Sequence, residues 1–247
     1  MNMINEINYP EQQYGNYTDT ENTIWALLYK RQMDSISAVA SPHFSNGLSL
    51  LGFTSASIPD FKQVNKHLHQ ATGWTIYAVP GLIPNDIFFH RMASKSFGAT
   101  CWLRKMEQLD YLEEPDMFHD VFGHVPLLAD PVISKFLEAL AGVAINYLDN
   151  EMVIEYIARL YWYTIEFGLI KEGGQLKIYG AGILSSIGET KFCLSTDANP
   201  IPFDVNQILQ TPYIKDSFQQ QYFVLDSIHQ LEGAVEELKK YIDQSIH

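Results

Sequence analysis

The sequence has little cysteine and no long uncharged hydrophobic run, and each shortage excludes a class of protein. Only Cys101 and Cys193 occur in 247 residues, so a disulfide framework is not expected and a reducing compartment fits the chain. No run of about 18 uncharged apolar residues is present, and the polar N-terminus lacks the apolar core of a signal peptide. We therefore expect a cytoplasmic protein that does not span a membrane.

Positive charge is also scarce. Lys and Arg number 16 against 29 Asp and Glu, which gives a formal net charge of −13. This excess of negative charge argues against binding to nucleic acid or to an anionic membrane surface, and it favours a small-molecule ligand. With 47% hydrophobic and 13% aromatic residues, the chain is able to bury a large core, most simply as one domain.

Hydrophobic periodicity and capping residues predict a mainly α chain with a small β component. Residues 1–18 are expected to form a loosely held polar arm, and residues 19–247 the domain. Helices are predicted after the capping residues Thr20, Asp60, Asn85 or Asp86, Asp130, Asn150 and Asp226, the fourth reaching about Leu148 and the fifth about Phe167. Strands are predicted over residues 74–79, 99–103 and 222–225.

The stretch 114–126, EPDMFHDVFGHVP, places two histidines, His119 and His124, five residues apart. An α-helix advances about 100° per residue, so side chains five apart diverge by roughly 140°. The two imidazoles therefore cannot easily bind one metal from an unbroken helix. Gly123 and Pro126 are expected to turn the backbone at this point.

Glu166 is the candidate third ligand, 42 positions after His124. An ordinary polar stripe with a surface pair of Glu155 and Arg159 would explain the same residue. The surrounding segment is crowded with aromatic side chains, however, and leaves little helix surface for water. A carboxylate in that setting needs a nearby cation.

Two neutral imidazoles and one carboxylate are the ligand set of non-haem Fe(II) oxygenases, in which three coordination positions stay open. Zinc hydrolases also use two histidines and a glutamate. Their helical histidines are four residues apart, whereas His119 and His124 are five apart with a glycine between them. The spacing therefore favours iron and leaves zinc open.

Three ordered motifs resemble the pterin-dependent aromatic amino acid hydroxylases. They are EPDMFHDVFGHVPLLAD at 114–130, YWYTIEFGL at 161–169 and KIYGAGILSSIGE at 177–189. Residues 25–32 and the loop 80–84 match in kind and order, so the resemblance runs from about residue 20 to residue 240. It implies a single basket-like catalytic domain, mainly helical, with iron in a cleft.

The resemblance also implies roles for individual residues. Iron(II) would be held by His119, His124 and Glu166. Tetrahydrobiopterin or another tetrahydropterin would be bound by Gly81, Ile83, Phe88, Asp120 and Tyr161, with Phe88 stacking on its ring. The aromatic amino acid would be bound by Arg104, Tyr111, Leu112, Trp162 and Ser185. Arg104 would pair with the substrate α-carboxylate, because a guanidinium offers parallel donors to two oxygens; taken in isolation, Arg104 reads as a surface ion pair.

The implied reaction is the mono-oxygenation of L-phenylalanine to L-tyrosine with Fe(II), dioxygen and a tetrahydropterin. Tryptophan or tyrosine hydroxylation within the same family is the main alternative; a zinc-dependent hydrolase and a non-enzymatic binding protein are more remote. The chain departs from the animal enzymes at Leu112 (threonine there), Asp120 (glutamate) and Gly98 (histidine). Gly98 would leave extra room near the aromatic ring.

The layout resembles the compact bacterial phenylalanine 4-hydroxylases of this family. We expect no regulatory domain and no tetramerisation tail, and hence a monomer or small homo-oligomer. The expected partners are an aromatic amino acid and dioxygen, without nucleic acid or membrane.

Overall fold

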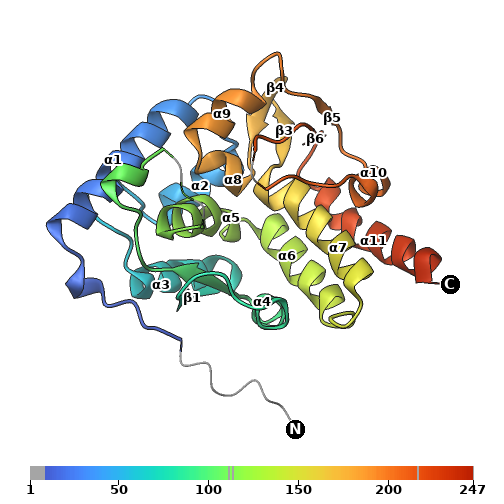
Figure 1. Cartoon of the computed structure of the whole chain (residues 1–247), viewed down its shortest axis with the longest axis horizontal. Coiled ribbons are helices and arrows are strands. Elements are labelled where there is room, and N and C mark those ends of the chain that lie inside the picture. Colours follow the sequence, from blue (N-terminus) through green and yellow to red (C-terminus); the bar gives the residue numbers. More distant parts are fainter. Residues whose placement is uncertain (1–8, 111, 113, 216, 247) are drawn as a thin grey trace, which may run out of the picture.

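The computed structural model describes residues 9–110, 112, 114–215 and 217–246. Helices dominate this part of the chain, as predicted, and the strands are short (Figure 1). The α-helices are α1 (Asp19–Ile36), α2 (Pro42–Leu50), α3 (Phe61–Thr72), α4 (Asn85–Ala93), α5 (Val125–Leu128), α6 (Pro131–Ala144), α7 (Glu151–Tyr161), α8 (Ala181–Leu184), α9 (Ile187–Cys193), α10 (Val205–Gln210) and α11 (Gln230–Ile246). Two π-helical turns, η3 (Phe118–His124) and η4 (Trp162–Glu166), and two 3₁₀ turns, η1 (Tyr14–Asn16) and η2 (Met106–Gln108), complete the helical part.

The strands form two small sheets. In the first, β1 (Thr75–Val79) pairs in parallel with β2 (Ser96–Thr100). The second has the order β4 (Gln175–Ile178), β3 (Leu169–Glu172), β6 (Tyr222–Leu225) and β5 (Pro200–Pro202). The predictions for β1 and β6 are confirmed, whereas β3, β4 and β5 were not predicted.

The strand predicted at 99–103 is displaced, because the chain leaves β1 after Thr100. The backbone N–H of Met117 donates to the carbonyl of Trp102, and that of Arg104 donates to the carboxylate of Asp116. These bonds tie the segment after β2 to the turn before η3. The displacement therefore brings Arg104 next to the histidine motif.

Three predicted caps are confirmed. The side chains of Asp60, Asp130 and Asn150 accept backbone N–H groups in the first turns of α3, α6 and α7. The cap predicted at Thr20 is wrong, since Thr18 and Glu21 form a reciprocal capping box that starts α1 at Asp19.

Three other helix limits also differ from the prediction. The residue before α4 is Pro84, whose side chain cannot cap. Helix α11 starts at Gln230, four residues after the predicted cap Asp226, whose carboxylate pairs with Lys171. The helix after Asp130 stops at Ala144 rather than near residue 148.

Residues 9–17 pack against the domain and are not loosely held. The side chain of Gln12 donates to the carbonyl of Pro59 and accepts from the N–H of Phe61. The Tyr17 hydroxyl donates to the carbonyl of Cys101 at 2.7 Å. The first eight residues of the expected arm lie outside the described part of the chain.

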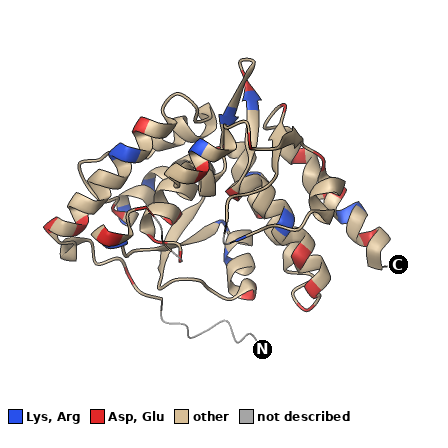
Figure 2. Ribbon diagram, turned by 45° about the horizontal axis from the view of Figure 1, so that its top comes forward, with Lys and Arg blue, Asp and Glu red and all other residues tan. Residues whose placement is uncertain are grey.

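One continuous hydrophobic core joins these elements. α6 packs against α4 and α11, and η3 lies among α5, α8 and β2. Charged residues of both signs are interspersed along the helices in the view of Figure 2. Within the described residues, no helix combines the length and apolarity needed to cross a bilayer.

Candidate metal centre

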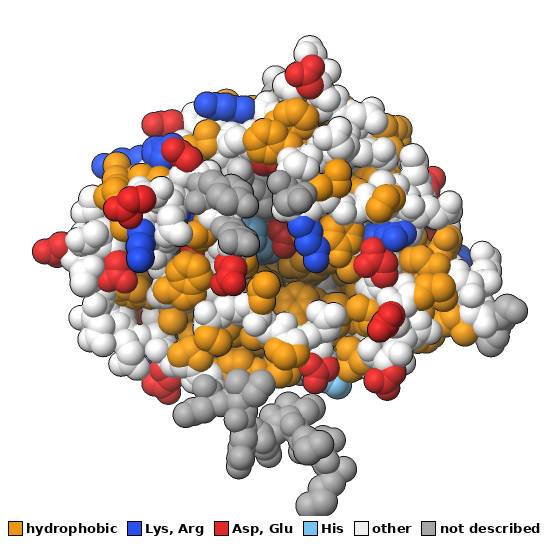
Figure 3. Space-filling view, viewed as in Figure 1, with side chains coloured by type: hydrophobic (Ala, Val, Ile, Leu, Met, Phe, Trp, Pro, Cys, Tyr) orange, Lys and Arg blue, Asp and Glu red, His pale blue; other side chains and the backbone are white. Residues whose placement is uncertain are grey.

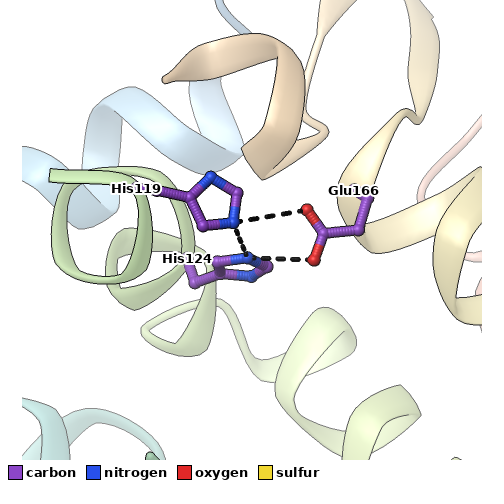
Figure 4. A group of neighbouring side chains, drawn as sticks. All are labelled: His119, His124 and Glu166. Carbon is purple, nitrogen blue, oxygen red and sulfur yellow. Dashed lines mark hydrogen bonds and ion pairs between the residues drawn. The ribbon is translucent and has the colours of Figure 1, made fainter. Parts of the chain in front are cut away.

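The side chains of His119, His124 and Glu166 converge on one point (Figure 4). The Nε2 atoms of the two histidines are 3.2 Å apart. His124 Nε2 is 3.1 Å from Glu166 Oε1, and His119 Nε2 is 3.7 Å from Glu166 Oε2. Atoms that each bind one metal ion at about 2.0–2.2 Å are separated by less than about 4.4 Å. The three donors therefore fit a common ion.

A π-helix explains how histidines five residues apart reach the same ion. Hydrogen bonds in η3 close over five residues instead of four, so residues i and i+5 lie nearly above one another. The predicted backbone turn at Gly123 and Pro126 is wrong: the helical path continues from η3 directly into α5. The α-helical angle of 100° per residue does not apply to this segment.

Gly123 has a different role, which is close packing. A Cβ atom at this position would lie 2.9 Å from the carbonyl oxygen of Ala181 in α8. Only glycine lets η3 approach α8 this closely. The approach matters because α8 leads directly to Ser185, which contacts one of the histidines.

Glu166 also lies on a π-helical turn. The N–H of Phe167 donates to the carbonyl of Trp162, five residues back, at 2.9 Å. The hydroxyl of Thr164 donates to the carbonyl of Leu160, four residues back, at 2.6 Å. This turn directs the Glu166 carboxylate inward from the end of α7.

Ser185 fixes the orientation of His119. The Ser185 hydroxyl donates to the carbonyl of Ala181 at 2.8 Å, so it accepts from His119 Nδ1, which is 2.9 Å away. This assignment places the imidazole proton on Nδ1 and leaves the lone pair of Nε2 free for a metal. Metal-binding histidines are commonly oriented in this way.

The protonation states of His119 and Glu166 suit a divalent cation. Burial lowers the pKa of His119, which keeps that imidazole neutral. Burial alone would raise the pKa of Glu166, but the neighbouring His124 and His119 hold it below its usual range. A neutral imidazole and an ionised carboxylate are the forms that bind metal. At His124, burial alone would lower the pKa, but the contact with Glu166 raises it above its usual range, so metal binding releases a proton there.

Arg104 forms a buried ion pair with Asp116, so a surface ion pair is excluded. Its Nε lies 2.9 Å from Asp116 Oδ2, and one terminal nitrogen lies 2.8 Å from Oδ1. Asp116 is fully buried and also accepts the backbone N–H of His119 at 3.2 Å. Arg104 is thus linked to the histidine turn through a carboxylate that the sequence reasoning missed.

Three of the residues assigned to the pterin, Phe88, Asp120 and Tyr161, lie close to the triad or to one another. Phe88 packs edge-on against Tyr161, and the Tyr161 ring stacks on His124 at 6.4 Å between centroids. Asp120 is buried and accepts the N–H of Thr100 at 2.8 Å; burial raises its pKa. Gly81 and Ile83 lie on the loop between β1 and α4, and Leu112 on the loop before η3. Tyr111 lies outside the described residues.

Gly98 leaves no spare room, contrary to expectation. A Cβ atom there would lie 2.9 Å from Val79 and 3.2 Å from the hydroxyl of Tyr77. Both side chains come from the paired strand β1 and fill the space.

On the face of the molecule shown in Figure 3, a hollow exposes a histidine and an acidic side chain, with apolar side chains around it.

Comparisons with known proteins agree with this geometry. The family model described as biopterin-dependent aromatic amino acid hydroxylase matches residues 9–247. A phenylalanine-4-hydroxylase of Chromobacterium violaceum is 48% identical over 223 residues, covering 89% of this chain and 74% of the relative. One from Caulobacter vibrioides is 45% identical over 228 residues, covering 90% and 76%. A crystal structure of the C. violaceum enzyme with iron(III) and 7,8-dihydrobiopterin superposes with a TM-score of 0.89 at 44% identity, covering 96% of this chain and 86% of the other.

Proposed function

This chain belongs to the biopterin-dependent aromatic amino acid hydroxylases, and on that premise we propose that it converts L-phenylalanine to L-tyrosine with iron(II), dioxygen and a tetrahydropterin. The observation that carries the proposal is the convergence of His119, His124 and Glu166 in the arrangement of a facial triad. The related bacterial enzymes support phenylalanine as the substrate.

His119, His124 and Glu166 hold the iron in this proposal. When bound, iron and the reduced pterin together activate dioxygen for transfer of one oxygen atom to the aromatic ring. Ser185 keeps the Nε2 lone pair of His119 directed at the site. Two π-helical turns carry the three ligands.

The remaining site residues orient the two organic molecules. Gly81, Ile83, Phe88, Asp120 and Tyr161 form the pterin side of the site. Arg104, Tyr111, Leu112, Trp162 and Ser185 form the amino acid side. Asp116 holds the Arg104 guanidinium in place, so its remaining donors meet the substrate α-carboxylate without reordering. The apolar side chains exclude water from the reacting ring.

An apolar slot favours phenylalanine over tyrosine. A tyrosine hydroxyl buried there would need a hydrogen-bond partner, and leaving it unpaired costs about 1–3 kcal/mol. Tryptophan differs from phenylalanine in size. Because Gly98 is closed off by Val79 and Tyr77, the extra room that would favour tryptophan is missing at this position.

Product analysis with the three aromatic amino acids tests the proposal. We expect the highest kcat/KM for phenylalanine, with tyrosine as the product and activity dependent on iron. Glu166→Ala should lose tightly bound iron and turnover while keeping its helical fold, because open catalytic sites contribute little to folding. Glu155→Ala, which removes the Arg159 partner on the preceding helix, is the matched control and should stay active. A higher kcat/KM for tryptophan, or full iron content in Glu166→Ala, would contradict the proposal.

The cellular setting is part of the same proposal. We place the enzyme in the cytoplasm as a monomer or small homo-oligomer. Both cysteines, Cys101 and Cys193, are free thiols, which suits a reducing compartment. Light scattering of the purified protein measures the oligomeric state directly.

A further inference from the structure

A buried chain of hydrogen bonds joins Trp162 to three residues that are distant from it in sequence. The indole Nε1 of Trp162 donates to the side-chain oxygen of Gln219 at 2.9 Å. The backbone N–H of Gln219 donates to Glu189 Oε1 at 3.2 Å. The hydroxyl of Tyr222 donates to the same carboxylate oxygen at 2.6 Å. The chain thus connects η4 with the segment before β6 and with α9.

Both the oxygen and the nitrogen of the Gln219 side-chain amide are hydrogen-bonded. Gln219 is 2% exposed, and its Nε2 donates to the carbonyl of Ile214 at 2.6 Å. An amide flip would place Nε2 against the indole N–H and the oxygen against a carbonyl, so it would break both bonds. The position of the acceptor for Trp162 is therefore fixed.

Glu189 holds the backbone at Gln219. Ser186 and Glu189 have the spacing of a capping box, and the Ser186 side chain does accept the Glu189 N–H. The Glu189 carboxylate, however, bonds to residues 219 and 222. Burial raises its pKa, so placing a carboxylate here is costly and needs both of these donors.

The Trp162 ring connects Gln219 with the residues that surround the metal centre. Its ring lies between those of Tyr213 and Phe167, at centroid distances of 4.6 and 4.8 Å. A Cβ atom on Gly182 would lie 3.0 Å from the Phe167 ring and 3.3 Å from Glu166 Oε2. The indole therefore packs on a ring that lies beside the carboxylate ligand.

We infer that Gln219 is a positioning residue for the aromatic amino acid, acting through the orientation of the Trp162 indole. Glu189 supports it by fixing the backbone from which the Gln219 side chain extends. The inference rests on the proposed function, in which Trp162 lies on the amino acid side of the site. It assigns no contact with pterin or iron to Gln219.

Gln219→Met tests the inference, because methionine keeps the length of the side chain and removes both polar groups. A neutral hydrogen bond contributes about 0.5–1.5 kcal/mol, so we expect roughly a three- to tenfold rise in KM for phenylalanine. The KM for tetrahydropterin and the iron content should not change. Gln32→Met is the matched control: Gln32 is also buried and hydrogen-bonded, but to Thr190, and its KM for phenylalanine should equal that of the wild type.

A double-mutant cycle with Trp162→Phe separates positioning from general destabilisation. If Gln219 acts through the indole, Gln219→Met should raise KM much less in the Trp162→Phe background. An equal rise in both backgrounds would overturn the inference. Failure of the wild-type enzyme to form tyrosine from phenylalanine would instead contradict the proposed function.

A measurement on the wild-type protein covers the case in which Gln219→Met does not fold. The NMR signal of the Trp162 indole N–H is identified by its loss in Trp162→Phe. Its hydrogen exchange is then measured in the zinc-loaded protein, which is diamagnetic. Slow exchange and a shift of this signal on addition of phenylalanine support the inference. Exchange as fast as that of a free indole, or no shift, would overturn it.

Discussion

At the scale of single residues, the Arg104 guanidinium has two roles. It pairs with Asp116 and, in the proposed function, it binds the substrate α-carboxylate. Two of its nitrogens are held by Asp116, which is fully buried and also bonded to the histidine turn. Removing the arginine would leave that carboxylate buried without a counter-charge, and such changes cost about 3–5 kcal/mol. Arg104→Ala would therefore report on folding as much as on substrate binding.

Arg104→Lys is the cleaner experiment. Lysine keeps a cation for Asp116, yet it cannot present parallel donors to a second carboxylate. A hydrogen bond to a charged group contributes about 1.5–3 kcal/mol, so we expect KM for phenylalanine to rise roughly ten- to a hundredfold. Steady-state kinetics with each substrate varied in turn measures the effect. A rise of the same size in KM for the pterin would point to a structural role.

Some site residues could be predicted from the sequence and others could not. His119, His124 and Glu166 carry metal-binding side chains within distinctive motifs, so residue type and resemblance together predicted that they lie in one site, and the structure brings them together. Gln219 lies 57 residues from its partner Trp162, and nothing in its local sequence marks it. Its contact exists only because the fold brings the two segments together.

At the scale of elements, local signals predicted those helix starts that depend on bonds between neighbouring residues. The caps at Asp60, Asp130 and Asn150 are bonds between neighbours, which a sequence pattern can encode. Strand β5 depends on pairing with β6 and had no local signal. The hairpin of β3 and β4 did have one that was missed, since Gly173 and Gly174, both at positive φ, form its two-residue turn. The π-helical turns depend on packing, as Gly123 against Ala181 shows.

Gly123→Ala tests the close packing of η3 on α8. The new methyl group would lie 2.9 Å from the carbonyl of Ala181, so the two elements must separate. We expect a loss of about 1–3 kcal/mol in the free energy of unfolding, together with weaker iron binding. Gly142→Ala is the control, since a Cβ atom at Gly142 meets nothing within 4 Å and alanine favours the helix. Equal stability of Gly123→Ala and the wild type would show that η3 does not need the glycine.

At the scale of the whole molecule, His43 connects three elements. It lies in the first turn of α2, with Nδ1 2.6 Å from Asp130 at the start of α6 and Nε2 3.4 Å from Glu172 in β3. The hydrogen bond to Asp130 raises the pKa of His43 above its ordinary 6.5. Burial alone would raise the pKa of Asp130, but the bond from His43 and the first N–H groups of α6 hold it below 3.8.

These shifts give the pair a defined pH window. The stability due to His43 is complete below pH 6.5 and is lost as the pH rises through the raised pKa of the folded protein. The stability due to Asp130 is complete above pH 3.8 and is lost as the pH falls through its lowered pKa. The pair therefore stabilises the fold fully between these two values.

His43→Gln should lose most stability inside that window. We expect a deficit of about 1.5–3 kcal/mol in the free energy of unfolding near pH 6, because a charge-assisted bond is lost. Denaturant unfolding of both proteins at several pH values measures the difference, which should shrink as the pH rises above the raised pKa. A deficit that does not vary with pH would mean that His43 acts by packing alone.

The π-helical turn η3, which carries His119 and His124, affects how helical metal sites should be aligned with one another. A π-helical turn is an α-helical turn with one inserted residue, and the helix after it continues into α5. A single codon therefore separates this ligand spacing from the i, i+4 spacing of the helical zinc hydrolases. An alignment of helical metal motifs must allow a one-residue gap between the ligands, or it will treat two related backbone solutions as unrelated.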